Sequence, residues 1–122
     1  MEKKMKAIIF IAHGSKKEQS NNEFVNLIEK VSKEDTKYDL KKAAFLELAT
    51  PSVQELAVDF IKKGAKHISF YPYFLNSGKH VLVDLPNIIE DLKKEYPLIE
   101  LKLLPHFGKS EKIKDIILSD IN

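Results

Sequence analysis

Three side chains that could bind a metal ion or move a proton each follow a different apolar segment of the chain. His13 comes directly after the apolar run 6–12, Glu47 lies near the end of the run 41–48, and His80 closes a loop after a third run. Imidazole titrates near neutrality and binds cobalt, nickel and ferrous iron, and a carboxylate can assist the metal or accept protons. Each residue also has an ordinary interpretation, as a loop, strand-end or helix-start residue. The residue types alone leave both interpretations open.

The elements that must position these residues are predicted by the spacing of apolar side chains. Continuous or alternating apolar runs predict four strands, at residues 6–12, 41–48, 68–74 and 99–103. Apolar residues at helical spacing follow each strand and predict four helices. Their apolar faces are Phe24, Leu27, Ile28 and Val31; Val53, Leu56, Ala57, Phe60 and Ile61; Leu85, Ile88, Ile89 and Leu92; and Ile113, Ile116 and Ile117.

Alternating strands and helices predict an α/β fold with a parallel sheet and helices on both faces. We expect a flavodoxin-like three-layer sandwich whose four-stranded parallel sheet has the order 2-1-3-4. Such sheets bind ligands beyond the carboxyl ends of their strands, where the strand order reverses, which here lies between strands 1 and 3. His13, Glu47 and His80 should therefore share one edge of the sheet, and this shared edge favours a common site.

Residues at the ends of the predicted helices indicate where each helix begins or stops. Ser20 with Glu23 forms a possible capping box for the first helix. Thr50 is expected to cap the second helix, with Pro51 at its first helical position and Gly64 at its C-terminal stop. The caps of the last two helices are expected at Asp84, just before Pro86, and at Ser110.

Composition and length exclude several classes of protein. The 122 residues fit a single domain, residues 1–122, and 20 basic and 18 acidic residues are mixed along it, unlike the basic stripe of a nucleic-acid binder. The absence of cysteine excludes disulfide scaffolds, iron–sulfur clusters and thiol nucleophiles. The basic and apolar start is too short for a signal peptide, and no run approaches the about 20 apolar residues of a membrane span. We expect a cytoplasmic protein with no nucleic-acid or membrane partner.

Three segments carry a resemblance to a known family. They are Ala-His-Gly-Ser at 12–15, Ala-Phe-Leu-Glu-Leu-Ala-Thr-Pro-Ser at 44–52, and Pro-Tyr-Phe-Leu-Asn-Ser-Gly-Lys-His-Val-Leu-Val-Asp-Leu-Pro at 72–86. In these motifs, their order and their spacing, the chain resembles the short CbiX-type sirohydrochlorin chelatases. These belong to the class II tetrapyrrole metal chelatases, together with the SirB-like and CbiK-like proteins. The resemblance covers nearly the whole chain.

This resemblance implies a lyase-class enzyme that inserts a divalent metal into a sirohydrochlorin-type tetrapyrrole for cobalamin, sirohaem or related biosynthesis. Cobalt is the metal expected first, with ferrous iron or nickel as alternatives; the metal is a substrate, and no cofactor is permanently bound. His13 and His80 match the family's metal ligands and, with Glu47, its catalytic residues. The implied substrate-binding residues are Glu47, Leu75, Asn76, Ser77, Gly78 and Lys79, and His106 is assigned no role.

The resemblance also implies one lobe per chain, because longer relatives hold two such lobes around the substrate. We therefore expect a homodimer, with the helices after strands 1 and 3 as its interface. Three other classes remain as alternatives. A flavodoxin-like nucleotide- or flavin-binding module would lack its glycine-rich loop, since Gly14 stands alone, and a hydrolase using Ser15 would lack a nucleophile elbow. A non-catalytic metal-storage or metal-transfer protein could use the same histidines.

Overall fold

A computed structural model describes residues 4–122, the side chain of Leu82 excepted. Four parallel strands form one sheet in the order β2-β1-β3-β4, which confirms the predicted topology. The elements are β1 (Met5–Ala12), α1 (Glu18–Glu34), β2 (Leu40–Phe45), α2 (Val53–Lys62), β3 (Ala65–Pro72), α3 (Leu85–Glu95), β4 (Glu100–Leu103) and α4 (Lys112–Ile121). None of the helices within 4–122 is long and apolar enough to cross a membrane.

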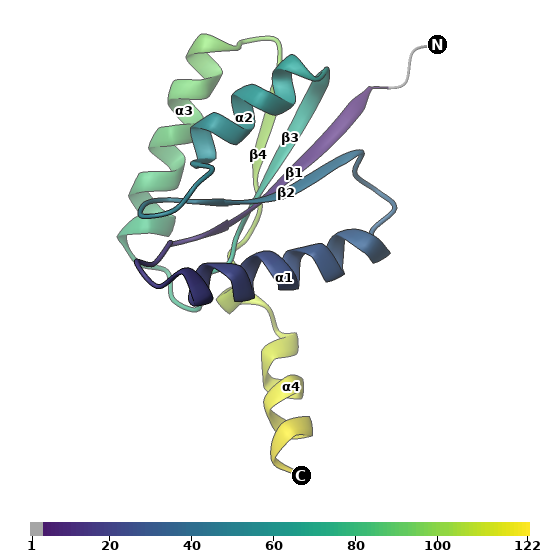
Figure 1. Cartoon of the computed structure of the whole chain (residues 1–122), viewed down its shortest axis with the longest axis vertical. Helices are drawn as coiled ribbons and strands as arrows, with labels where there is room; N and C mark the ends of the chain where they lie inside the picture. The colour runs from purple at the N-terminus through teal and green to yellow at the C-terminus, as the bar shows by residue number, and fades with distance from the viewer. Residues whose placement is uncertain (1–3) are drawn as a thin grey trace.

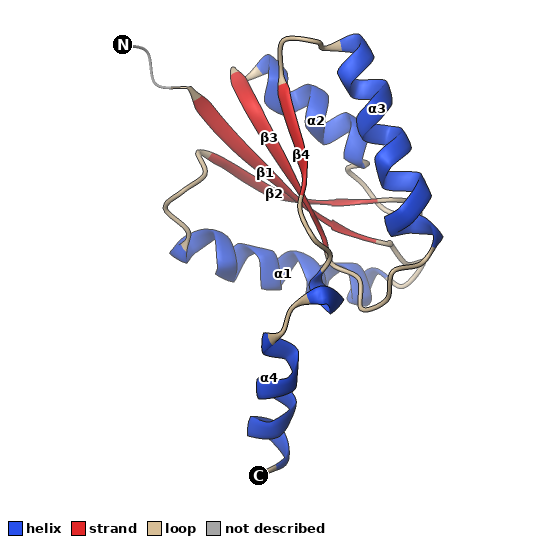
Figure 2. Ribbon diagram, turned by 180° about the vertical axis from the view of Figure 1, so that it is seen from behind, coloured by secondary structure: helices blue, strands red, loops and turns tan. Residues whose placement is uncertain are grey.

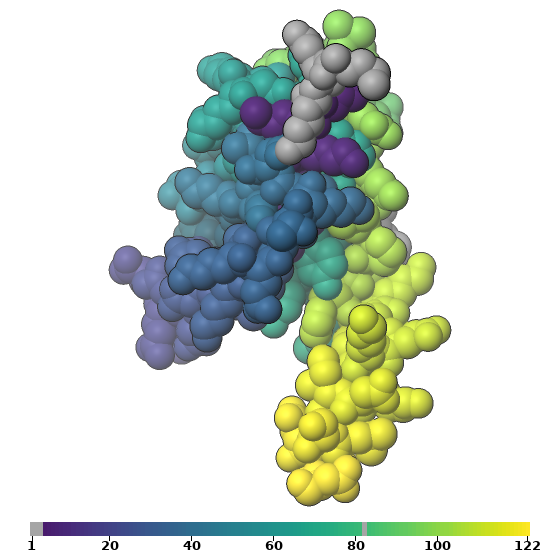
Figure 3. Space-filling view, turned by 90° about the vertical axis from the view of Figure 1, so that its right-hand side faces the viewer, coloured from purple at the N-terminus to yellow at the C-terminus, as the bar shows by residue number. Residues whose placement is uncertain are grey.

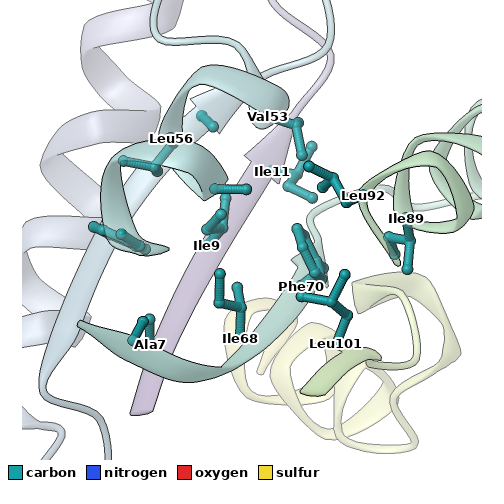
Figure 4. Close-up of a cluster of buried hydrophobic side chains, with 14 of the residues drawn as sticks. Ala7, Ile9, Ile11, Val53, Leu56, Ile68, Phe70, Ile89, Leu92 and Leu101 are labelled. Atoms are coloured by element: carbon teal, nitrogen blue, oxygen red, sulfur yellow. The ribbon is translucent and has the colours of Figure 1, made fainter. Parts of the chain in front are cut away.

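Helices cover the two faces of the sheet unequally. Helices α2 and α3 lie on one face and α1 on the other (Figure 1). The α2/α3 face holds the larger core, in which Ile9, Ile11 and Phe70 are fully buried (Figure 4). On the opposite face, Phe24 and Ile28 of α1 pack on apolar residues of β1 and β2. Burial on both faces explains why β1 is a continuous apolar run.

Helix α4 stands apart from these layers. It extends away from the rest of the chain (Figures 2 and 3), and none of its residues is buried. The predicted cap at Ser110 is one residue too early, because the helix begins at Lys112 with Glu111 at the cap position and no side-chain capping bond. The Ser110 hydroxyl still accepts a hydrogen bond from the backbone N–H of Lys112 at 3.2 Å.

The predicted start of α1 is wrong. The helix begins at Glu18, with Lys17 at the cap position and no side-chain capping bond, and Ser20 lies inside it. The preceding loop is held by Asn21 instead. Its side chain accepts a hydrogen bond from the Ser15 backbone N–H at 2.9 Å and donates one to the Ser15 carbonyl at 2.8 Å. This amide contact fixes the loop after β1, and the helix starts three residues earlier than predicted.

The predicted start of α2 is also wrong, by two residues. Ser52, not Thr50, caps the helix: its hydroxyl accepts from the Glu55 N–H at 3.1 Å, and the Glu55 carboxylate accepts from the Ser52 N–H at 3.1 Å. The Ser52 N–H thereby lowers the pKa of Glu55. Pro51 lies before the helix, where its carbonyl accepts from the Phe45 N–H at 2.9 Å. Gly64, with φ of +108°, does end the helix as predicted.

Two strands end earlier than their apolar runs predict. Strand β2 stops at Phe45 instead of residue 48, so Glu47 lies in the loop beyond it, and Leu48 takes a positive φ of 64°. Strand β3 covers Ala65–Pro72, while residues 68–74 were expected. In both places apolar residues continue past the last strand pairing into the loops at the carboxyl edge of the sheet.

A polar network ties β3 to β4 near their first residues. The Glu100 carboxylate lies 3.1 Å from Nδ1 of His67, whose Nε2 lies 3.1 Å from the Ser69 hydroxyl. The Tyr38 hydroxyl donates to the same Ser69 oxygen at 3.2 Å. The hydrogen bond from His67 holds the pKa of Glu100 below its ordinary value. This network lies at the opposite end of the strands from the predicted site.

Candidate functional site

Gly14 brings the loops after β1 and β2 into contact. The Leu46 N–H donates to the Ala12 carbonyl at 3.0 Å, and the Glu47 N–H donates to the His13 carbonyl at 3.0 Å. Gly14 has φ of +99°, and a Cβ atom there would lie 1.7 Å from the Glu47 carbonyl oxygen. Only glycine satisfies both the backbone conformation and the close approach. The Ala-His-Gly sequence therefore builds one side of the site.

This contact places His13 beside Glu47. Nε2 of His13 lies 2.6 Å from Oε1 of Glu47, and both side chains are about half exposed. An ionised carboxylate can only accept a hydrogen bond, so Nε2 then carries the hydrogen and Nδ1 keeps its lone pair. His13 can thus offer Nδ1 to a metal ion or a proton while Glu47 orients the ring.

His80 lies in a π-helical turn, His80–Asp84, that leads into α3. Its Nδ1 lies 2.8 Å from Oδ2 of Asp84. This contact corrects the expectation that Asp84 caps α3. Asp84 is itself helical, with φ of −64° and ψ of −49°, and makes no side-chain capping bond. With Nδ1 donating to Asp84, the Nε2 lone pair of His80 is available.

The contact between Asp84 and His80 was not predicted from the sequence. The two residues are four positions apart, a spacing that puts two side chains on the same side of a helical turn and could have indicated the contact. The neighbouring Pro86 favoured the interpretation as a cap instead. That interpretation assumed that the helix starts after Asp84, whereas helical turns begin four residues earlier.

The two histidines meet at the carboxyl edge of the sheet. The ring centroids of His13 and His80 are 4.4 Å apart, with the planes inclined by 44°. The Phe74 ring also stacks on His80, with centroids 6.3 Å apart and planes inclined by 21°. Three residues from three strand–helix units, His13, Glu47 and His80, are therefore brought together where the strand order predicted. Within residues 4–122, no three histidine or acidic side chains converge as a preformed metal cage.

Two hollows flank the histidine pair. One, of about 460 Å³, is lined by His13, Gly14, Phe24 and Tyr73 among others. The other, of about 280 Å³, is lined by residues that include Glu47, His80 and Asp84. The larger hollow has the size of a small-molecule site. Its Tyr73 ring belongs to an aromatic row in which Phe24 lies 5.2 Å away on one side and Phe107 5.1 Å away on the other.

Comparison with known proteins shows the family to which this chain belongs. The family model CbiX matches residues 7–122. The chain belongs to the CbiX family. It is 30% identical over 118 residues to the sirohydrochlorin ferrochelatase of Priestia megaterium, a match that covers 97% of this chain and 44% of the relative. It is 32% identical over 85 residues to the sirohydrochlorin cobaltochelatase of Methanocaldococcus jannaschii, covering 70% of this chain and 59% of that protein.

Solved structures of similar fold include a chain of about this length and a chain of about twice this length. A putative cobalamin biosynthesis CbiX protein from Marinobacter aquaeolei VT8 has a TM-score of 0.79 and 27% identity, covering 95% of this chain and 97% of that chain. SirB from Bacillus subtilis with Fe³⁺ has a TM-score of 0.87 and 24% identity, covering 97% of this chain and 48% of that chain. This CbiX-family chain thus spans about half the length of the first curated relatives that it matches.

The loop after β3 completes the edge in this CbiX-family chain. Its residues Leu75, Asn76, Ser77, Gly78 and Lys79 are all exposed. Apart from its chain neighbours, no atom that the structure describes lies within 4 Å of the position that a Cβ of Gly78 would take, so the space beside its backbone is open to a ligand. Gly108 supports the loop from behind: its N–H donates to the Phe74 carbonyl at 2.8 Å, and a Cβ there would lie 1.6 Å from the Leu75 oxygen.

Proposed function

We propose that this chain inserts a divalent metal ion into a sirohydrochlorin-type tetrapyrrole as a lyase-class chelatase. The observation that carries the proposal is the pairing of His13 and His80, 4.4 Å apart at the carboxyl edge of the sheet. Membership of the CbiX family and relatives named sirohydrochlorin ferrochelatase and cobaltochelatase support it. Those names differ in the metal, so cobalt, which we expect first, must be compared with ferrous iron and nickel.

The reaction needs a ligand that delivers the metal and then releases it. Insertion forms bonds from the metal to the four ring nitrogens, breaks two pyrrole N–H bonds and releases two protons. Nε2 of His80 is the proposed metal ligand, held in place by the Asp84 contact at Nδ1. His13 is the second ligand. Two imidazoles leave other coordination positions free for the incoming ring nitrogens, and imidazole suits all three candidate metals.

The same pair supplies a proton acceptor. After the metal ion has left Nδ1 of His13 for the ring nitrogens, this atom accepts one pyrrole proton, and the Glu47 carboxylate, 2.6 Å from Nε2, stabilises the resulting imidazolium. The second pyrrole proton passes to water. Metal binding at His80 and proton acceptance at His13 can then occur at adjacent rings. Glu47 also lines the hollow beside His80, where it can contact the substrate directly.

The substrate's peripheral carboxylates need hydrogen-bond donors around the edge of the site. The exposed loop after β3 offers backbone N–H groups at Asn76, Ser77 and Gly78 and the ammonium group of Lys79. Leu75, also exposed, provides an apolar contact at the edge of the macrocycle. Tyr73, in its aromatic row with Phe24 and Phe107, forms a wall for the ring's face.

A flat macrocycle has two faces, and one lobe provides a wall on only one of them. Ligand sites generally bury most of their ligand. We therefore include a homodimer in the proposal: a second copy closes the site from the other face, as a symmetric pair. We place the reaction in the cytoplasm, as the sequence predicts.

The test is anaerobic insertion by the purified chain with sirohydrochlorin and cobalt, ferrous iron or nickel, each followed by visible absorption. The expected result is protein-dependent formation of the metallated product, fastest with cobalt. The matched controls are His13→Ala and His80→Ala in the same metals. Metal binding without insertion would contradict the proposal and favour the metal-storage or metal-transfer alternative.

A further inference from the structure

One asparagine side chain ties the loop after β1 to the first turn of α1. Oδ1 of Asn21 accepts a hydrogen bond from the Ser15 N–H at 2.9 Å, and Nδ2 of Asn21 donates one to the Ser15 carbonyl at 2.8 Å. A peptide N–H can only donate and a carbonyl can only accept, so one orientation of the amide satisfies both groups. These two half-buried bonds hold the Ser15 backbone as a pair, and we call them the Asn21 clamp.

The Asn21 clamp acts next to the most flexible point of this loop. Gly14 precedes Ser15 and has φ of +99°, in a region that glycine enters and leaves with little cost. On one side of Gly14, the His13 carbonyl accepts from the Glu47 N–H at 3.0 Å. On the other side, the clamp fixes the peptide that joins Gly14 to Ser15. The rotation of Gly14 is therefore restrained from both sides.

The position of the His13 ring depends on this restraint. Within residues 4–122, the polar and ring contacts of its imidazole are the Glu47 carboxylate, 2.6 Å from Nε2, and the His80 ring, with centroids 4.4 Å apart. The His13 and Glu47 side chains are about half exposed, so water competes for their contact and its net effect is small. The backbone must therefore fix the ring: Ala12, paired within the sheet, does so on one side and the restrained Gly14 on the other.

The Asn21 clamp also joins two walls of the larger hollow. The hollow of about 460 Å³ is lined by His13, Gly14 and Ser15 from the loop and by Asn21 and Phe24 from α1, among others. Because the clamp connects the loop to the helix, neither wall can move away from the other without breaking its two bonds. The clamp thus fixes both the width of the hollow and the loop that carries His13.

We propose that Asn21 is a positioning residue of the insertion reaction. By fixing the peptide between Gly14 and Ser15, it holds the His13 imidazole on the Glu47 carboxylate, with Nδ1 free for the metal ion. Asn21 touches neither the metal nor the reacting nitrogens in this role and acts through His13. The inference rests on the proposed function for what His13 does, whereas the effect of Asn21 on the ring is measurable without metal or substrate.

The first test compares nitrogen-15 spectra of the histidine side chains in the native chain, Asn21→Ala and Asn22→Ala at about pH 8, where ordinary histidines are neutral. In the native chain, His13 should carry its hydrogen on Nε2, facing Glu47, and His80 on Nδ1, facing Asp84. In Asn21→Ala, the two nitrogen signals of His13 should move toward each other as its tautomers mix, while those of His80 stay unchanged. His80 is therefore an internal control, since a general loosening of the fold would move both rings.

Asn22→Ala is the matched control. Asn22 is the next residue of α1, is exposed, and makes no side-chain hydrogen bond within the described part of the chain. Its spectrum should equal that of the native chain. Native His13 signals in Asn21→Ala, or equal changes at His13 and His80, would overturn the inference.

A second variant covers the case in which Asn21→Ala does not fold. Asn21→Asp keeps an acceptor for the Ser15 N–H but places a carboxylate oxygen against the Ser15 carbonyl, so it breaks one bond of the clamp. An acidic side chain in the first turn of α1 is favoured by the helix dipole, which offsets part of the lost stability. The same change at His13 alone is expected in this variant, and its absence would overturn the inference.

The second test measures insertion by folded Asn21→Ala under the conditions of the native assay. The kcat should fall by about 10- to 100-fold, while the KM for sirohydrochlorin stays close to native, because the loss lies in the orientation of His13. A loss confined to KM, or an equal loss in Asn22→Ala, would contradict the positioning role. If the native chain inserted no metal, the proposed function would fail, while a change confined to the His13 spectrum would still show that Asn21 positions this ring.

Discussion

Replacing Gly14 with alanine should destabilise the chain and pull His13 away from Glu47. Gly14 has φ of +99°, and a side chain there costs about 1–3 kcal/mol in backbone strain. The new Cβ would also lie 1.7 Å from the Glu47 carbonyl oxygen, while ordinary contacts start at 3.4 Å. The Glu47 loop must therefore move, and crowding of this kind adds about 1–3 kcal/mol. The expected loss in free energy of unfolding is about 2–6 kcal/mol.

Activity should fall more steeply than stability suggests. The displaced carbonyl belongs to Glu47, whose carboxylate orients His13 at 2.6 Å. A misplacement of about 1 Å in a catalytic arrangement can cost about 100-fold in rate. We expect Gly14→Ala to lose at least about 100-fold in insertion rate, measured by visible absorption on protein that circular dichroism shows to be folded. At about 4 °C per kcal/mol, its melting temperature should fall by about 8 °C or more.

Substitutions at two other glycines distinguish the cost of backbone strain from the cost of steric overlap. Gly64 has φ of +108°, but a Cβ there would meet only the Met5 side chain at 3.9 Å. Gly64→Ala should therefore show the strain of about 1–3 kcal/mol alone, with insertion unchanged. Gly78→Ala, whose new Cβ would have no described atom beyond its chain neighbours within 4 Å, should leave stability unchanged. If Gly14→Ala were as stable and as active as Gly64→Ala, the close approach at Gly14 would not build the site.

Other side chains give sharper tests of single contacts. His13→Ala and His80→Ala should each lower insertion by about 100-fold or more with melting temperatures within a few degrees of native, because both rings lie at an exposed edge; near-normal turnover in both would remove them from the site. Asp84→Asn should weaken cobalt binding by about 10- to 100-fold in a visible-absorption titration, with partial recovery in Asp84→Glu, because the carboxylate no longer orients His80; unchanged binding would make the contact merely structural. The bond from His67 lowers the pKa of Glu100 from 4.5, so Glu100 stabilises the native state above that pH and loses this effect as pH falls through the lower folded value. Glu100→Gln should thus lower the urea midpoint near neutral pH and flatten its acid decline, whereas an identical pH profile in both proteins would contradict the assignment.

The parts of the fold that the sequence predicts are those with a local signal. The buried run of β1 and the helical spacing of Phe24 and Ile28 depend only on residues near each other in the chain. Because alternating strands and helices restrict the topology, they also led to the order of the sheet and to the edge where the strands end. That edge was enough to bring His13, Glu47 and His80 together before any distance was known.

The errors arose where contacts of the preceding loop, not the cap pattern itself, decide where a helix begins. Ser20 has the sequence of a cap, but the Asn21 amide fixes the loop by bonding Ser15 and the helix starts earlier. Ser52, not Thr50, caps α2, and the Pro51 carbonyl just before it accepts a hydrogen bond from the Phe45 N–H. A pattern of cap residues shows which side chains could cap a helix. The hydrogen bonds of the preceding loop determine which one does.

The arrangement of the site suits a metal that must leave it. A structural metal site surrounds its ion with four protein ligands, whereas a catalytic site keeps positions open. Here the Glu47 carboxylate contacts Nε2 of His13, and the Asp84 carboxylate contacts Nδ1 of His80. These carboxylates therefore orient the imidazoles without occupying the coordination positions on the metal that the macrocycle's nitrogens must take. Under the proposed function, these contacts hold the two lone pairs ready, and the second copy confines the macrocycle against them until the protons have been transferred.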